Sequence, residues 1–323
     1  MAIVGHFENL AEAQKLVQSK LLAGVVEETI EEGQLLPRLP VVTINSKTLL
    51  YNRESTLPSA DFYDIHEQIP WTADVDYATQ VEVTLKRVIR QDILDNFMLK
   101  TYKDPNDYKT QIISELRKGC MRTVESTLLY GDATGTHKEF DGLMKLCAAA
   151  MKVNEGSGAL SLANWRQLFD TMKLKPHQWL TPHEIARRVD AAYQEAAIGG
   201  TLTSGLLTYG KGDAGAQQSY FMGIPIVRSD YMTMTETAGG WPETGGATAS
   251  ILGLHFGQIM EGGICLCTGG DTGGVDFFNL VELDELEDYD AGGIRLVAYC
   301  ALANGSTKSL GLLHSITDAA VTA

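Results

Sequence analysis

The sequence predicts an α+β fold, because long strands and a long helix are indicated in separate stretches of the chain. Residues 79–90, TQVEVTLKRVIR, alternate apolar and polar side chains, which is the period of a half-buried strand. Between residues 108 and 128 an apolar residue recurs every four positions, which is typical of a helix. With 323 residues, 44% of them hydrophobic, the chain can bury a large core as one elaborate domain or two lobes.

The composition argues against several classes of protein. The formal net charge is −15, with 41 acidic and 26 basic residues, so a nucleic-acid backbone would on balance be repelled. The five cysteines form no CxxC pair, which predicts buried thiols in a reducing compartment such as the cytosol. Cys265 and Cys267 are two positions apart, as on one face of a strand. No long apolar run is present, so we expect neither export nor membrane insertion.

The chain begins with a predicted amphipathic helix over residues 7–23, which ends near Gly24. Pro37 and Pro40 then favour an extended segment, with a strand from about Val41. Residues 48–53, TLLYNR, are also typical of a strand.

The stretch between the strands at 48–53 and 79–90 is long and shows no period. Its side chains include Phe62, Tyr63, Ile65, Ile69 and Trp71, whereas disordered tracts are poor in such residues. A connection this long is usually functional, or supported from outside the subunit. We therefore expect a loop that becomes ordered against a neighbouring molecule. The candidate interface residues are Arg53, Glu54, Phe62, Tyr63, Ile65 and Trp71.

The long helix is predicted from Pro105 to Tyr130, because Asp104 can cap it and proline suits the first helical position. The text that follows, LLYGDATGTHKEFDGL, contains residue types found in phosphate loops and metal sites. Lys138 does not have the spacing of a phosphate-loop lysine. His137, Asp132 and Asp141 are candidate metal ligands, but the histidines of the chain form no HxH or HxxxH pair. A loop that ends the helix is favoured over a metal site.

The next part of the chain mixes helices and strands. Residues 161–173 are predicted as helix and 177–180 as a short strand. A second helix is expected to start with a capping box at Thr181, Pro182 and Glu184. Further strands, separated by glycine-rich turns, are expected over 205–232 and 251–303.

Three motifs offer enzyme or metal interpretations. Gly210, Gly212 and Gly215 fit GxGxxG, with Asp230 downstream, but only seven residues precede the next turn, so a hairpin is favoured over a dinucleotide site. The single DTG at Asp271 lacks the second carboxylate loop that an aspartic protease needs. The acidic run 282–290 can attract a divalent cation, but a solvated edge is the default interpretation. We therefore assign no catalytic, cofactor-binding or metal-binding residue.

Five sequence segments, taken in chain order, resemble those of one known family. They are GVVEETIEEGQLLPRLP, TLLYNRESTLPSADFYDIHEQ, LLYGDATGTHKEFDGL, YFMGIPIVRSDYM and RLVAYCALANGSTKSLGLLHSI. With the order of predicted elements, they resemble the major capsid proteins of tailed bacteriophages, whose shell fold is shared with encapsulins. The resemblance covers nearly the whole chain.

The resemblance implies the phage major capsid protein fold and its division into parts. These would be an N-terminal arm at 1–40, an extended β-hairpin loop at 41–92, a peripheral domain with the spine helix at 93–140 and 274–323, and an axial domain at 141–273. It also implies a structural protein, made late in infection and not an enzyme, that forms hexamers and pentamers. These would close as an icosahedral shell around double-stranded DNA, assembled in the host cytoplasm and present in the virion.

Some partners follow only from the family. A portal protein and a decoration protein would be further partners of the shell. The short arm predicts a separate scaffolding protein, because some relatives carry a long scaffolding segment in the same chain. Some relatives also crosslink a loop lysine to an asparagine; Lys47 and Asn304 are the candidates here, but the surrounding text predicts a shell without crosslinks.

Two alternatives stay open. An encapsulin nanocompartment would have the same fold with an enzyme as cargo, and the long loop and chain disfavour it. A soluble nucleotide-binding enzyme would use residues 210–215.

Overall fold

The computed structural model describes residues 33–54, 59–69, 71, 79–96, 105–134, 138–194, 207–211, 217–237, 245–269, 278–285 and 290–322. All of them belong to one unit, Glu31–Ala323. They form a mixed α+β fold, as the sequence predicts. The helix expected over 7–23 lies outside the described residues.

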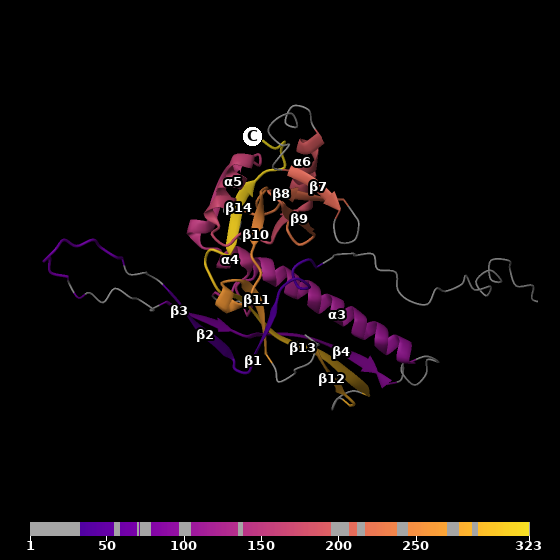
Figure 1. Ribbon diagram of the computed structural model, residues 1–323. Coiled ribbons are helices and arrows are strands. Elements are labelled where there is room, and N and C mark those ends of the chain that lie inside the picture. The colour runs from indigo at the N-terminus through magenta and orange to yellow at the C-terminus, as the bar shows by residue number, and fades with distance from the viewer. Residues whose placement is uncertain are drawn as a thin grey trace, which may run out of the picture. The chain divides into compact units, whose positions relative to one another are not determined.

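One sheet has five strands in the order β1-β11-β13-β12, with β4 on the other side of β13 (Figure 1). β1 and β11 are parallel, and the other pairs are antiparallel. The helix α3 contacts β4 and β13. The bounds are β1 Val41–Ile44, β4 Lys86–Asp95, β11 Ile264–Gly269, β12 Asn279–Leu283, β13 Ala291–Asn304 and α3 Pro105–Tyr130.

A second sheet has seven strands in the order β5-β14-β10-β6-β9-β8-β7. The helix α5 packs on β5 and β14, and α6 packs on β6 and β9. The core there is aromatic: the rings of Trp165 and Phe221 stack with centroids 3.9 Å apart. The bounds are β5 Lys152–Gly158, β6 Gln178–Pro182, β7 Leu207–Lys211, β8 Gln217–Phe221, β9 Ile224–Ser229, β10 Ala249–Leu254, β14 Leu310–Ile316, α5 Leu162–Thr171 and α6 His183–Gln194. Short turns of helix lie at Leu143–Leu146 (α4), Ala149–Met151 (η1) and Ile259–Glu261 (η2).

The helix α3 has the bounds that the sequence predicts, Pro105–Tyr130. Its four-residue apolar repeat is buried at Leu116, Cys120, Val124 and Leu128. Val124 and Leu128 belong to a core cluster that also contains residues of both sheets. The helix is therefore a shared support for the two sheets.

The predicted strand over 79–90 is wrong in one respect, because the chain forms two strands there. β3 (Thr79–Thr84) pairs with β2 (Thr48–Arg53), whereas β4 pairs with β13. Between them, the Leu85 amide donates to the Lys47 carbonyl at 2.9 Å. The alternation runs through the break because both strands have one buried face.

The capping box predicted at Thr181 is also wrong. Thr181 and Pro182 end β6, and α6 begins at His183. The Thr181 hydroxyl donates to the Val227 carbonyl at 3.4 Å, across the parallel β6–β9 pair. The Thr181 side chain, which could have capped the helix, is therefore hydrogen-bonded to the neighbouring strand β9.

The division into arm, loop, peripheral and axial domains stays a prediction. Strand pairing puts β14, from the predicted peripheral domain, in the seven-stranded sheet. It puts β11, from the predicted axial domain, in the five-stranded sheet.

All five cysteines are free and buried, as the sequence predicts. Cys265 and Cys267 lie together on β11. No helix within the described ranges is both long and apolar enough to cross a membrane.

Candidate subunit interface

The long loop connects β2 and β3. The end of β2 next to the loop is hydrogen-bonded to the end of β13. The register runs from Thr48 opposite Thr84 to Arg53 opposite Thr79. The Tyr51 hydroxyl donates to the Asn304 carbonyl at 2.6 Å, and burial raises the pKa of this phenol. The hairpin therefore starts from a fixed place in the fold.

Arg53, a predicted interface residue, lies at this end of β2. Its Nε donates to the Gly305 carbonyl at 3.0 Å, and its terminal nitrogen donates to the Asn304 carbonyl. The guanidinium carbon lies 5.6 Å from the centre of the Tyr51 ring. The described contacts of Arg53 are thus within its own chain, whereas Glu54, beside it, is exposed.

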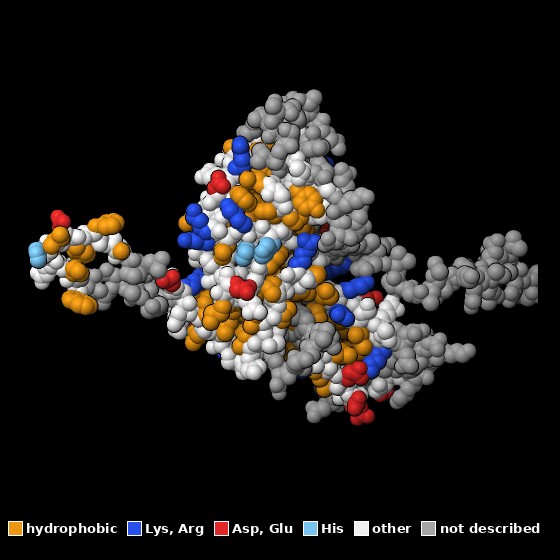
Figure 2. Space-filling model, in the orientation of Figure 1, with side chains coloured by type: hydrophobic (Ala, Val, Ile, Leu, Met, Phe, Trp, Pro, Cys, Tyr) orange, Lys and Arg blue, Asp and Glu red, His pale blue; other side chains and the backbone are white. Residues whose placement is uncertain are grey.

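The loop itself presents large apolar side chains to solvent. Phe62 is 104% exposed, Trp71 102% and Ile65 86%, whereas Trp165 and Trp179 are fully buried. Figure 2 shows hydrophobic side chains, in orange, along the extension on the left that carries this loop. Covering one such side chain is worth about 1.5–3 kcal/mol, so the loop is a strong candidate for contact with another molecule. Tyr63 is half-exposed, at 40%.

The loop also has local order and negative charge. The Asp64 amide donates to Glu67 Oε2 at 2.8 Å, and the Glu67 amide donates to the Asp64 carbonyl at 3.1 Å. His66, inside this turn, has a φ of 74°. The turn sets apolar groups beside acidic ones.

Sequence reasoning missed exposed apolar residues outside the loop. Ile89 is 40% exposed and Ile93 is 59% exposed, both on β4, and Leu50 on β2 is 53% exposed. The only sequence signal for these residues was the alternation of residues 79–90. It predicts a strand with two faces, but it does not indicate what covers each face.

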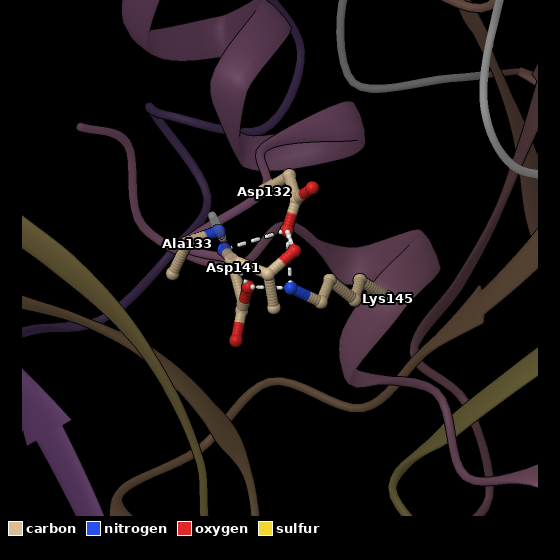
Figure 3. Close-up of polar contacts among 5 residues, drawn as sticks. Asp132, Ala133, Asp141 and Lys145 are labelled. Atoms are coloured by element: carbon tan, nitrogen blue, oxygen red, sulfur yellow. Dashed lines mark hydrogen bonds and ion pairs between the residues drawn. The ribbon is translucent and has the colours of Figure 1, made fainter. Parts of the chain in front are cut away.

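The stretch after α3 is a loop that ends the helix, as predicted (Figure 3). The Gly131 amide continues the helical pattern by donating to Thr127 at 2.9 Å. Lys145 Nζ forms ion pairs with Asp132 and with Asp141 Oδ1, the second at 2.7 Å. Asp141 Oδ1 also accepts a hydrogen bond from the Ala133 amide at 2.8 Å. One ammonium thus binds both carboxylates.

The electrostatics of this cluster follow from those contacts. Hydrogen bonds from the side chain of Lys145, and then from Thr134, hold the pKa of Asp132 well below its ordinary range. Burial lowers the pKa of Lys145, but the two carboxylates outweigh it and leave that pKa raised. The arrangement is a structural ion-pair cluster. His137 lies outside the described residues.

The first glycine of the GxGxxG motif lies in a pair of antiparallel strands, which agrees with the predicted hairpin. Gly210 on β7 is opposite Gln218 on β8, whereas a dinucleotide-binding unit would require parallel strands. Gly212, Gly215 and the DTG at 271–273 lie outside the described residues. In the acidic run, Glu282 pairs with Lys109 at 2.7 Å. Within the described ranges, no three metal-ligating side chains are grouped.

Known structures match this arrangement along its whole length. An encapsulin complex from Synechococcus elongatus PCC 7942 is 16% identical, with a TM-score of 0.71 over 97% of both chains. The capsid of a native GTA particle is 14% identical, with a TM-score of 0.64 over 96% of this chain and 100% of that one. Mycobacterium phage Adephagia gives 15% identity and a TM-score of 0.60 over 94% and 97%.

The chain has the fold shared by phage capsid proteins and encapsulins. The predicted fold class is thus confirmed. No sequence-family model and no curated protein matches the chain by sequence. At 10–16% identity, the likeness to solved capsids lies in the course of the chain.

Proposed function

We propose that the chain is the major capsid protein of a tailed bacteriophage, which self-assembles as hexamers and pentamers into an icosahedral shell around double-stranded DNA. The observation that carries the proposal is the exposed loop on a full-length capsid fold: Phe62 and Trp71 are completely exposed on a chain that matches capsid chains end to end. A monomer gains nothing from such exposure, whereas a lattice of copies can cover it.

Shell assembly also explains how modest contacts suffice. Each loop can bury only a few side chains, so a single contact is weak. In a closed shell each subunit makes several contacts at once, and the collective strength far exceeds that of one contact. The net charge of −15 suits a container that does not hold its genome tightly.

The other partners follow from this proposal. A portal protein, a separate scaffolding protein and a decoration protein are its expected companions, and the virion its location. We expect no covalent crosslink through Asn304, because it is 4% exposed and its Oδ1 accepts from the Ser309 hydroxyl at 2.6 Å. A crosslink there would have to extract this side chain from the core.

An encapsulin-type nanocompartment is the second candidate. The encapsulin likeness has a TM-score of 0.71 and spans 97% of both chains. The expectation that encapsulin chains are too short is therefore wrong for this relative, and length does not separate the two candidates.

Purified particles test the proposal. The chain is expressed with the proteins of its natural gene neighbourhood, and particles are imaged and analysed for contents. Nuclease-protected double-stranded DNA and a portal protein support the phage capsid. A co-purifying enzyme without DNA supports the nanocompartment, and a chain that never assembles contradicts both.

A further inference from the structure

We propose that His177 and His255 form an acid-sensitive joint, in which protonation of His177 loosens the connection between the seven-stranded sheet and the five-stranded sheet. The joint lies within one chain and needs no second copy. It therefore goes beyond the proposed function, and it can be tested whether or not the chain forms shells.

The first observation is the place of this pair in the fold. Residues 255–257 follow β10 of the seven-stranded sheet and adjoin β11 of the five-stranded sheet. The His255 amide donates to the Ser309 carbonyl, just before β14, at 3.0 Å. The His255 carbonyl accepts from the amide of Ile264, the first residue of β11, at 2.9 Å. Phe256 and Ile264 also form an isolated parallel bridge. This short segment therefore connects the two sheets.

The second observation is a pair of stacked imidazole rings on this segment. The ring centroids of His177 and His255 are 4.3 Å apart, and the ring planes differ by 26°. His177 directly precedes β6, and its amide donates to the Leu254 carbonyl at 2.8 Å. His177 is exposed and His255 is half-buried, so protons from solvent can reach both rings.

The third observation is that hydrogen bonds fix which ring nitrogen carries a proton. The Lys175 carbonyl can only accept, so His255 Nδ1, 2.7 Å away, must be protonated. The Phe256 amide can only donate, so His177 Nδ1, 3.1 Å away, must present a lone pair. A proton added to His255 enters at Nε2 and leaves its hydrogen bond intact. A proton added to His177 enters at Nδ1, so the Phe256 amide loses its acceptor.

The surroundings of the pair oppose a positive charge on His177. Partial burial, and then the neighbouring His255, lower the pKa of His177. No acidic side chain of the described residues forms an ion pair with either histidine. The charged side chains that the structure describes on the segments around the pair are those of Arg38, Lys173, Lys175, Lys308 and Glu261. Only the last is negative, and its Oε2 accepts the Gln258 amide at 3.3 Å.

The direction of the pH dependence follows from these contacts. Because the pKa of His177 is lower in the folded chain than in the unfolded chain, the unfolded chain binds the proton more tightly. The joint is therefore closed above the ordinary histidine pKa of about 6.5, and it opens as the pH falls below that value.

Amide hydrogen exchange of the full chain, measured by mass spectrometry at about pH 7.5 and about pH 5, tests the joint. After correction for intrinsic exchange rates, peptides within residues 254–264 should exchange about tenfold faster at the lower pH, as expected for the loss of one hydrogen bond. His177→Gln should abolish this rise, because the glutamine oxygen accepts the Phe256 amide but does not titrate. The control His66→Asn, in the exposed loop, should keep the rise, since asparagine tolerates the φ of 74° at that position.

A second variant, His255→Gln, decides the matter if His177→Gln does not fold. Its side-chain amide can still donate to the Lys175 carbonyl, but it removes the charge that lowers the pKa of His177, so the rise should begin at a higher pH. An unaltered chain without the rise, a rise that persists in His177→Gln, or an unshifted rise in His255→Gln would overturn the inference. So would an equal rise in peptides from the whole chain, which would indicate global unfolding. Each of these results leaves the proposed function standing, because none depends on assembly.

Discussion

Arg53 fastens the loop to the rest of the fold through its contacts with Gly305, Asn304 and the Tyr51 hydroxyl. We expect Arg53→Ala to lower the free energy of unfolding by about 1–3 kcal/mol, because these are charged hydrogen bonds at a half-buried site. Urea unfolding measures the change. The matched control is Glu54→Ala at the exposed neighbouring position, which should stay within about 0.5 kcal/mol. Equal stability of the two variants would contradict the anchoring role.

The lowered pKa of Asp132 predicts that the folded state loses stability at acid pH. Its folded-state pKa is lowered, so the unfolded chain binds the proton more tightly. The stabilisation is fully present above the ordinary aspartate pKa of about 3.9, and is lost as the pH falls below that value. Urea unfolding at several pH values should show a steeper acid loss for the unaltered chain than for Asp132→Asn. Asp61→Asn, in the exposed loop, serves as control; an unchanged acid slope in Asp132→Asn would refute the assignment.

Residue identity predicted some of these features and missed others. The buried cysteines were predicted from the absence of a CxxC pair, and the exposed apolar residues of the loop were predicted from the aromatic residues in a long connection. Arg53 next to Glu54 carries no signal that one side chain faces its own chain and the other faces solvent. That distinction depends on Asn304 and Gly305, some 250 positions away.

At the scale of elements, alanine substitutions at Gly119 in α3 and at Gly131 after its end should have opposite effects on stability. A Cβ on Gly119 would meet nothing within 4 Å, whereas a Cβ on Gly131 would lie 2.3 Å from the Phe140 carbonyl. Gly119→Ala should therefore stabilise the protein by about 0.5–1 kcal/mol, by favouring the helix. Gly131→Ala should destabilise it by about 1–3 kcal/mol, by overpacking. Thermal unfolding compares the pair, and changes of the same sign would contradict the geometry.

Local signals predicted α3 well, because its start, its repeat and its end all lie in its own sequence. They failed at Leu85 and Thr181 for a shared reason. Each residue bonds to a distant one, Leu85 to Lys47 and Thr181 to Val227, and such partners are set by tertiary pairing.

At the scale of the whole molecule, sheet membership was the least predictable feature. β13 contacts β4, β11 and β12, which lie in three separate parts of the chain. No periodic pattern states such pairings, so the predicted domain boundaries came only from the family resemblance. The candidate loop, by contrast, could be found from sequence, because its apolar residues have no period that would bury them within one element.

Assembly through the loop predicts that exposed apolar residues are not interchangeable. Phe62→Ser with Trp71→Ser should abolish shell formation while leaving the unfolding of the subunit unchanged, because both side chains are solvent-exposed. The matched control is Met260→Ser, at a side chain that is 95% exposed but lies outside the loop.

The most direct test of shell formation is sedimentation velocity of the purified chain at rising concentration, with electron microscopy of the fastest fraction. The account predicts closed shells for the unaltered chain and for Met260→Ser, and slow, small species for the Phe62 and Trp71 double variant. An unaltered chain that sediments as a monomer at every concentration, or a double variant that forms the same shells, would contradict it.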